Sequence, residues 1–233
     1  METARKHLQL DTCSGAEVSK AEDEKPPELF QKSELTDITL VVEGKELHFA
    51  KYPLMAGSVV FTNMIKGSAD TSRLVLDDVP YKDMIMFLEC LHPKTLQVIT
   101  DTNLEQVTGI AHRFKQEVIL HRCEEYICKK FNKNYKSMDG MYPQFFFHLR
   151  VADKYGMKTA LQAGLGSDRI KTAYFSSKDL GSYESSNTFK GYENDENFRL
   201  LSYKTKFEIL GRRLTVTEEI MDPKYPFQTE YLY

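Results

Sequence analysis

The sequence predicts an α+β fold: a small β-sheet flanked by a cluster of helices, followed by a helical hairpin extension and an irregular C-terminal tail. Short stretches with alternating apolar residues lie between residues 37 and 49. Apolar residues at helical spacing follow from residue 52 onward. A pattern of small, aromatic, leucine and small residues then occurs twice, which indicates a repeated pair of helices.

Two neighbouring strands are predicted near the start of the α+β region. Ile38, Leu40 and Val42 alternate with other residues, and the segment is rich in β-branched side chains, as is typical of a strand. Gly44 supplies the residue that a tight turn needs, and residues 46–49 alternate again. The two segments together predict a β-hairpin.

Helices are predicted on both sides of another short strand at residues 73–76. Ser58 can cap a helix that runs to Lys66, because its hydroxyl can accept a hydrogen bond from a free backbone N–H at the helix start. Pro80 marks the start of a later helix, since proline is tolerated in a first turn, and His92–Pro93 ends that helix. The apolar faces of these helices are Val60, Phe61, Met64 and Ile65 in the first and Met84, Phe87, Leu88 and Leu91 in the second.

A four-residue pattern occurs twice, 41 residues apart (152 minus 111), as Ala111, Phe114, Leu120, Cys123 and then Ala152, Tyr155, Leu161, Gly164. One explanation is a helix-turn-helix unit used twice, with two hairpins stacked in series. The other is a coincidence between two unrelated amphipathic helices. The pattern alone leaves both explanations open.

Composition divides the chain into four parts. Residues 1–28 are polar and of mixed charge, so we expect a disordered leader. The α+β domain is expected at 29–131 and the helical extension at 132–175. Residues 176–233 are polar and predict a weakly structured C-terminal segment.

The bulk properties exclude several classes of protein. A net charge of −3 with interspersed signs is unlike the basic face of a nucleic-acid binder, so we expect no nucleic-acid partner. The sequence shows neither a secretory signal nor an apolar stretch that could span a membrane. Most of its four cysteines lie in apolar periodic segments, as free buried thiols do. We therefore expect an intracellular protein of the cytoplasm, the nucleus or both.

No sequence pattern indicates a catalytic, cofactor-binding or metal-binding site. Cys123 and Cys128 are five residues apart, about 140° around a helix, so they face different ways and do not make a metal site. Gly164-Leu165-Gly166 lacks the third glycine of a dinucleotide fingerprint and reads more simply as a helix end. Cys123 with His112 or His121 could be a nucleophile and its base, but a core cysteine is the simpler interpretation. We expect a protein that is not an enzyme, with no catalytic, cofactor-binding or metal-binding residues.

Several segments of the sequence, taken in order, resemble a known family. Residues 37–51 resemble the opening of a BTB/POZ domain, and Leu54 with residues 58–61 matches the next helices of that family. Residues 110–114 and 122–127 resemble its closing helical hairpin. The order and spacing agree from about residue 29 to residue 131, which implies the BTB/POZ fold for this region.

The second helical unit, residues 145–170, resembles the start of the extension that follows many BTB domains, the BACK or three-box region. The resemblance is closest to BTB proteins that carry MATH domains, although no MATH domain is expected in this sequence. Zinc fingers, kelch repeats and a channel are not expected either.

The resemblance implies a homodimer and, in many members, service as a substrate adaptor for cullin-3, the scaffold of a ubiquitin ligase. The implied dimer-interface candidates are Leu29, Phe30, Leu35, Asp37, His48 and Lys51. For Asp37, a strand-start residue satisfied by backbone amides is an equally good interpretation. The cullin-facing candidates are Ile65, Ser68, Asp70, Phe145 and Phe146.

The sequence departs from the cullin-binding pattern in two places. The loop before the strand at 73–76 lacks the hydrophobic-x-Glu motif, and the usual aromatic near His92 is missing. The alternative function is therefore a non-catalytic oligomerisation scaffold or transcription-regulatory subunit without a ubiquitin-ligase role. In either case the client protein is unknown from sequence.

Overall fold

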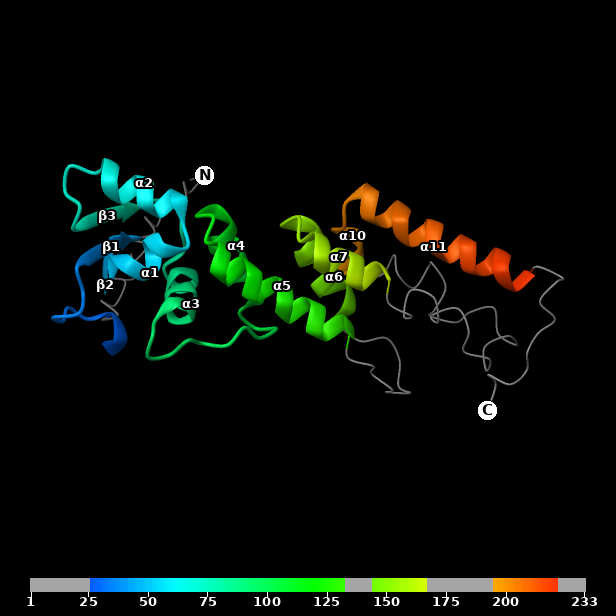
Figure 1. The fold of residues 1–233 in the computed structure, drawn as a ribbon, viewed down its shortest axis with the longest axis horizontal. Helices are drawn as coiled ribbons and strands as arrows, with labels where there is room; N and C mark the ends of the chain where they lie inside the picture. Colours follow the sequence, from blue (N-terminus) through cyan, green and yellow to red (C-terminus); the bar gives the residue numbers. More distant parts are fainter. Residues whose placement is uncertain (1–25, 133–143, 167–194, 222–233) are drawn as a thin grey trace, which may run out of the picture.

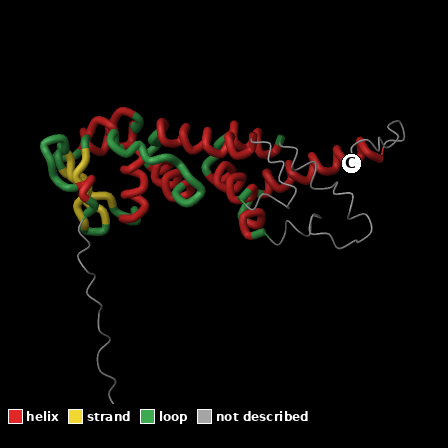
Figure 2. Tube along the Cα trace, turned by 90° about the horizontal axis from the view of Figure 1, so that it is seen from below, coloured by secondary structure: helices red, strands yellow, loops and turns green. Residues whose placement is uncertain are grey.

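The computed structural model describes residues 26–132, 144–166 and 195–221, with side chains described as far as residue 212. Figures 1 and 2 show an elongated arrangement in which the strands are confined to one end and helices fill the rest. The elements are, in chain order, η1 (Glu28–Phe30), β1 (Ile38–Val42), β2 (Lys45–Phe49), α1 (Lys51–Ala56), α2 (Val59–Gly67), β3 (Arg73–Leu76), α3 (Tyr81–Leu91), α4 (Leu104–Arg113), α5 (Glu117–Asn132), α6 (Phe145–Lys154), α7 (Lys158–Leu165), α10 (Glu196–Arg199) and α11 (Tyr203–Met221).

The sheet has the strand order β2-β1-β3. β1 and β2 form the predicted antiparallel hairpin, with Val42 opposite Lys45. Its two-residue turn has positive φ at both Glu43 (51°) and Gly44 (77°), the conformation that suits the twist of a hairpin. β3 pairs with β1 in parallel. The three predicted strands and the α+β fold class are therefore confirmed.

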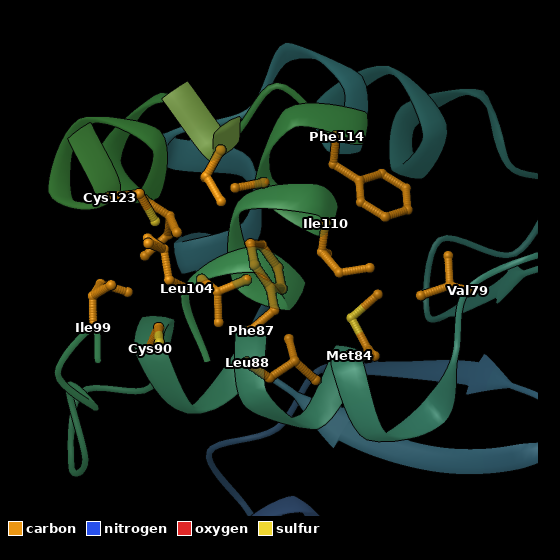
Figure 3. Packing of buried hydrophobic residues seen from close by; sticks show 14 of the residues in the cluster. Val79, Met84, Phe87, Leu88, Cys90, Ile99, Leu104, Ile110, Phe114 and Cys123 are labelled. Atoms are coloured by element: carbon orange, nitrogen blue, oxygen red, sulfur yellow. The ribbon is translucent and has the colours of Figure 1, made fainter. Parts of the chain in front are cut away.

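The helices α1 to α4 pack around a common core next to the sheet (Figure 1). Figure 3 shows side chains from α3, α4 and α5 converging in this core. The rings of Phe61 and Phe114 stack with centroids 4.3 Å apart. Ser58 caps α2 as predicted, because its hydroxyl oxygen accepts a hydrogen bond from Phe61 N at 3.0 Å. The same hydroxyl donates to the carbonyl oxygen of Phe114, so the cap also ties α2 to the end of α4.

The helices α4–α5 and α6–α7 form two helix-turn-helix units, in agreement with the sequence pattern. The turns of the two units have the same backbone geometry at an offset of 41 residues. Each turn contains one residue of positive φ, Lys115 at 49° in the first and Gly156 at 66° in the second. In each turn a backbone N–H also donates to the carbonyl five residues earlier, at 2.8 Å from Gln116 to Ala111 and at 2.8 Å from Met157 to Ala152. A coincidence between unrelated helices does not account for this shared geometry. α5 packs against α7, so the units are stacked.

The C-terminal part departs from the prediction of a weakly structured segment. That prediction is wrong for residues 195–221, which contain α10 and α11. Asp195 caps α10 by accepting hydrogen bonds from Asn197 N and Phe198 N, and Phe198 and Ile209 are buried against the extension. The apolar anchors are widely spaced in a polar stretch, so composition concealed them. The predicted leader falls almost entirely within residues 1–25, outside the described residues.

Candidate self-association surface

The N-terminal segment before β1 is anchored in the core by Phe30. Its side chain is fully buried, and its ring lies 6.2 Å from that of Phe49 and 6.4 Å from that of His92, centroid to centroid. The prediction that Phe30 contacts a partner chain is wrong, because the aromatic side chains of its own domain enclose the ring. Leu29 is half-buried, and Leu35 is exposed.

Asp37 links this segment to the first helix. Its exposed carboxylate accepts a hydrogen bond from the backbone N–H of Lys51, the first residue of α1, at 2.6 Å. This contact agrees with the interpretation of Asp37 as a strand-start residue satisfied by a backbone amide. The remaining dimer candidate, His48, lies on β2, where its Nδ1 is 3.0 Å from the Thr39 hydroxyl.

Large apolar side chains are exposed around this first helix. Leu35 is 78% exposed, Tyr52 81%, Val59 69% and Val118 55%. The Asp37–Lys51 hydrogen bond brings the segment that carries Leu35 to the start of α1, which carries Tyr52. We call Leu35, Tyr52, Val59 and Val118 the N-terminal apolar face. Contiguous exposed apolar side chains are typical of interaction sites, so this face is a candidate for one.

A close junction between α1, α2 and α5 holds this face together. Glu117 N donates to Gly57 O at 2.9 Å, and the Gln116 side-chain amide donates to Pro53 O at 3.1 Å and to Leu54 O at 3.2 Å. A Cβ at Gly57 would lie 1.7 Å from Gln116 Oε1 and 3.2 Å from Val118 Cγ2. A side chain at position 57 would therefore have to displace the Gln116 amide, so glycine suits the close approach of α5 that brings Val118 beside the junction.

Sequence reasoning missed Tyr52, Val59 and Val118. Tyr52, the half-buried Met55 and Val59 are spaced by three and four residues, so they could have been read as a second apolar face beside the buried one. Val118 comes from a distant segment, and only the folded chain brings it near Gly57.

The cullin-facing candidates are not gathered on one surface. Ile65, Phe145 and Phe146 are buried, so their prediction as surface contacts is wrong. Ile65 lies in the core of the N-terminal domain, while the Phe145 ring packs on Phe131 and the Phe146 ring on Phe198. Ser68 is half-buried and Asp70 is exposed in the loop after α2. The Asp70 carboxylate accepts hydrogen bonds from Ser72 N at 2.8 Å and from the Ser72 hydroxyl at 2.6 Å.

A polar seam joins the N-terminal domain to the extension, and no sequence pattern indicated it. Asp101, just before α4, accepts hydrogen bonds from Tyr126 Oη at 2.6 Å, Lys130 Nζ at 2.9 Å and His148 Nε2 at 2.7 Å. Burial works to raise the pKa of Asp101, but these hydrogen bonds outweigh burial and lower the pKa below its usual value. Burial lowers the pKa of His148, against the opposing effect of Asp101.

A second contact of the seam is a bidentate ion pair. Arg150 of α6 donates to both carboxylate oxygens of Glu105 on α4, at 2.7 Å each, and to Asn197 Oδ1 at 2.8 Å. The hydrogen bonds from Arg150 lower the pKa of Glu105, although burial opposes them. Glu124 of α5 accepts from the backbone N–H of Thr159 at the start of α7, at 2.8 Å. The extension is thus fixed to the domain by charged groups as well as by apolar packing.

The cysteines in the described residues are free. Cys90 and Cys123 are fully buried, and burial raises the pKa of each thiol to about 11. A thiol with such a pKa is a poor nucleophile at neutral pH, as expected of a core residue. Within the described ranges, no group of three or more His, Cys, Asp or Glu side chains could hold a metal ion. No helix in the same part of the chain has the length and apolar character needed to cross a membrane.

Comparison with known proteins identifies the domain around this surface. Residues 27–131 match the BTB/POZ domain family. The chain is also similar to BTB and MATH domain-containing protein 36 of Caenorhabditis elegans, with 28% identity over 99 residues. The match covers 41% of this chain and 31% of the relative, so the chain spans about a third of the relative's length. The predicted resemblance is thereby confirmed, and residues 27–131 form a BTB/POZ domain, a type of domain that generally serves as a non-catalytic module for protein–protein interaction.

Proposed function

We propose that the chain is an intracellular protein-interaction adaptor that forms a homodimer through the N-terminal apolar face. The observation that carries the proposal is the exposure of Leu35, Tyr52, Val59 and Val118 around a helix that the Gly57 junction joins to α5. In a two-fold interface each of these side chains is buried twice, once from each protomer. Burying a large apolar side chain contributes about 1.5–3 kcal/mol, so this face can supply much of a stable association.

The oligomeric state of purified full-length protein tests this proposal. We expect a dimer by light scattering at tens of micromolar, and monomers for Tyr52→Asp combined with Val59→Asp. The matched control is Val75→Asp, because Val75 is also an exposed apolar residue but lies on β3, away from α1. This control should stay dimeric. A monomeric wild-type protein, or equal loss of the dimer in the control, would contradict the proposal.

Recruitment of cullin-3 is a second proposal. It is supported by the BTB/POZ domain and by the exposed Asp70 carboxylate in the loop where cullin-binding relatives carry their motif. The loop offers no apolar anchor, and Ile65, Phe145 and Phe146 are buried. We therefore expect binding about tenfold to a hundredfold weaker than that of a BTB protein with the complete motif, because one anchor can supply a couple of kcal/mol.

Calorimetry with the cullin-3 N-terminal domain and the full chain tests the second proposal. Asp70→Lys should weaken binding further, while Asp78→Lys, at an exposed carboxylate in another loop, should not. Tight binding of the cullin-3 domain that Asp70→Lys does not change would contradict the expected low affinity. No binding would favour the alternative function, an oligomerisation scaffold or transcription-regulatory subunit without a ubiquitin-ligase role.

A further inference from the structure

α10 and α11 lie at the opposite end of the described structure from α1 (Figure 1). Leu200, directly after α10, and two residues of α11 are large apolar side chains exposed to solvent. Leu200 is 68% exposed, Tyr203 90% and Phe207 76%. They follow one another at spacings of three and four residues, so Tyr203 and Phe207 lie on one side of α11 and Leu200 precedes them. We call these three residues the C-terminal ridge.

The opposite side of α11 is fixed to the extension. Ile209 and Thr205 are buried there, and the Thr205 hydroxyl donates to Asp153 Oδ1 at 2.6 Å. Ser202 N donates to Asp153 Oδ2 at 2.6 Å, and Arg212 donates to Leu165 O at 3.2 Å. The helix cannot turn the C-terminal ridge inward without breaking these contacts. The exposure of the ridge is therefore a property of the docked helix.

Basic side chains accompany the ridge. At about 100° per residue, Lys204 lies on one side of the line through Tyr203 and Phe207, and Lys206 lies on the other. Lys206 Nζ stands 5.6 Å from the Tyr203 ring centroid. Lys206 Nζ also donates to Arg199 O at 2.7 Å, whereas Arg212 lies on the opposite side of α11. At the same 100° per residue, Glu208 lies farther from the ridge than either lysine does. The two lysines therefore place positive charge along both sides of the apolar ridge.

We propose that the C-terminal ridge binds an acidic amphipathic helix of a partner protein. Apolar side chains of that helix would cover Leu200, Tyr203 and Phe207, and its carboxylates would lie near Lys204 and Lys206. Helices bind helical surfaces through apolar anchors at spacings of three and four residues, and complementary charge fixes their orientation and speeds encounter. A second copy of the chain fits less well, because a two-fold contact between ridges would set like charges against each other.

The ridge differs from the N-terminal apolar face in position and chemistry, so it adds a partner site to the proposed adaptor. It does not depend on homodimer formation. A monomer with an intact ridge would bind the same partner.

Selection from a library of random 16-residue peptides displayed on phage tests the proposal, with the full chain as target. The variant Tyr203→Ser with Phe207→Ser serves for counter-selection. We expect the enriched peptides to be net negative, with apolar residues at spacings of three and four. A synthetic peptide from the selection should bind the wild type at least tenfold more tightly than the double variant.

Further variants test how much charge contributes to peptide binding, with a check that each variant is folded. Lys204→Glu should weaken the peptide about tenfold, and binding should fall as salt rises from 0.05 to 0.3 M, because charge contributes to it. Val75→Ser, at an exposed apolar residue of β3, should bind as the wild type does. Circular dichroism and the thermal midpoint confirm that each variant is folded.

Several outcomes overturn the proposal. These are enriched peptides that are neutral or basic, or the absence of any peptide that distinguishes the double variant from the wild type. Loss of oligomeric mass in the double variant would assign the ridge to a second copy instead. Ridge-dependent binding to phosphatidylserine vesicles without peptide binding would assign it to a membrane surface.

Discussion

Replacing Asp101 by alanine tests whether the polar seam holds the extension on the BTB/POZ domain. Asp101 accepts three hydrogen bonds, from Tyr126, Lys130 and the buried His148, and about a fifth of its side chain is exposed. Hydrogen bonds to a charged group contribute about 1.5–3 kcal/mol each, but they are not additive when they share one acceptor. We therefore expect Asp101→Ala to lower the free energy of unfolding by about 3 kcal/mol. This is a large share of the 5–15 kcal/mol typical of a domain.

Equilibrium urea denaturation of the full chain measures this change, and Asp101→Asn shows how much of it requires the charge. The matched control is Asp70→Ala, which removes an exposed carboxylate that also accepts two hydrogen bonds, both from Ser72, and should change little. A loss below about 1 kcal/mol for Asp101→Ala would show that apolar packing alone holds the seam.

Hydrogen exchange adds a local readout to the same experiment. The last turn of α3 and the loop that follows it are tied to α5 by Arg122, which donates to Cys90 O at 2.7 Å and to Gln97 O at 2.8 Å. Asp101 ties the end of the same loop to α5. Without Asp101, the loop residues near position 101 and the backbone of α6 should exchange faster, while β1 should not. Unchanged exchange in both segments would refute the idea that Asp101 couples the loop to the extension.

Three further predictions follow from buried groups. The pKa of His148 lies below its usual 6.5 in the folded chain, so the unfolded chain binds the proton first. The free energy of unfolding should then fall as pH drops from 7 to 5, and His148→Gln should flatten this dependence; a steeper fall in the variant would contradict the sign. Cys123, whose thiol pKa is about 11, should react with a thiol reagent far more slowly in native protein than in denaturant, and Cys123→Ala should cost about 1 kcal/mol in urea denaturation. Gly57→Ala should displace the Gln116 amide, which lowers the free energy of unfolding by about 1–3 kcal/mol and with it the thermal midpoint. Gly67→Ala should not lower the midpoint, because nothing lies within 4 Å of a new Cβ there. Equal effects of the two variants would refute the close approach at Gly57.

The parts of the fold that depend on neighbours in sequence could be predicted. The alternation of Ile38, Leu40 and Val42, the glycine of the hairpin turn and the cap at Ser58 each act within a few residues, and the structure agrees with all of them. The repeated helix pair could also be predicted, because each unit carries the same local residue pattern, and the backbone hydrogen bonds of the two turns match.

The candidate site was predicted less well, because its residues depend on distant contacts. Whether Phe30 or Phe145 is buried is decided by partners such as Phe49 and Phe131, which periodicity cannot assign. The seam at Asp101 joins residues 47 positions apart in the sequence (148 minus 101), so no local pattern indicates it. Charged residues that pair across such distances look like ordinary surface residues in a sequence.

The length of the helical stack bears on avidity. α11 lies at the opposite end of the chain from β1 to β3 and the N-terminal apolar face (Figure 1). A dimer formed through that face would carry its two C-terminal ridges on arms that lead away from the two-fold axis. A client with two acidic helices could occupy both ridges only if its linker spanned the separation, and it would then gain affinity through effective concentration without any new contact. Clients with short linkers would bind one arm at a time, so the length of the arms would select partners by their dimensions as well as by their charge.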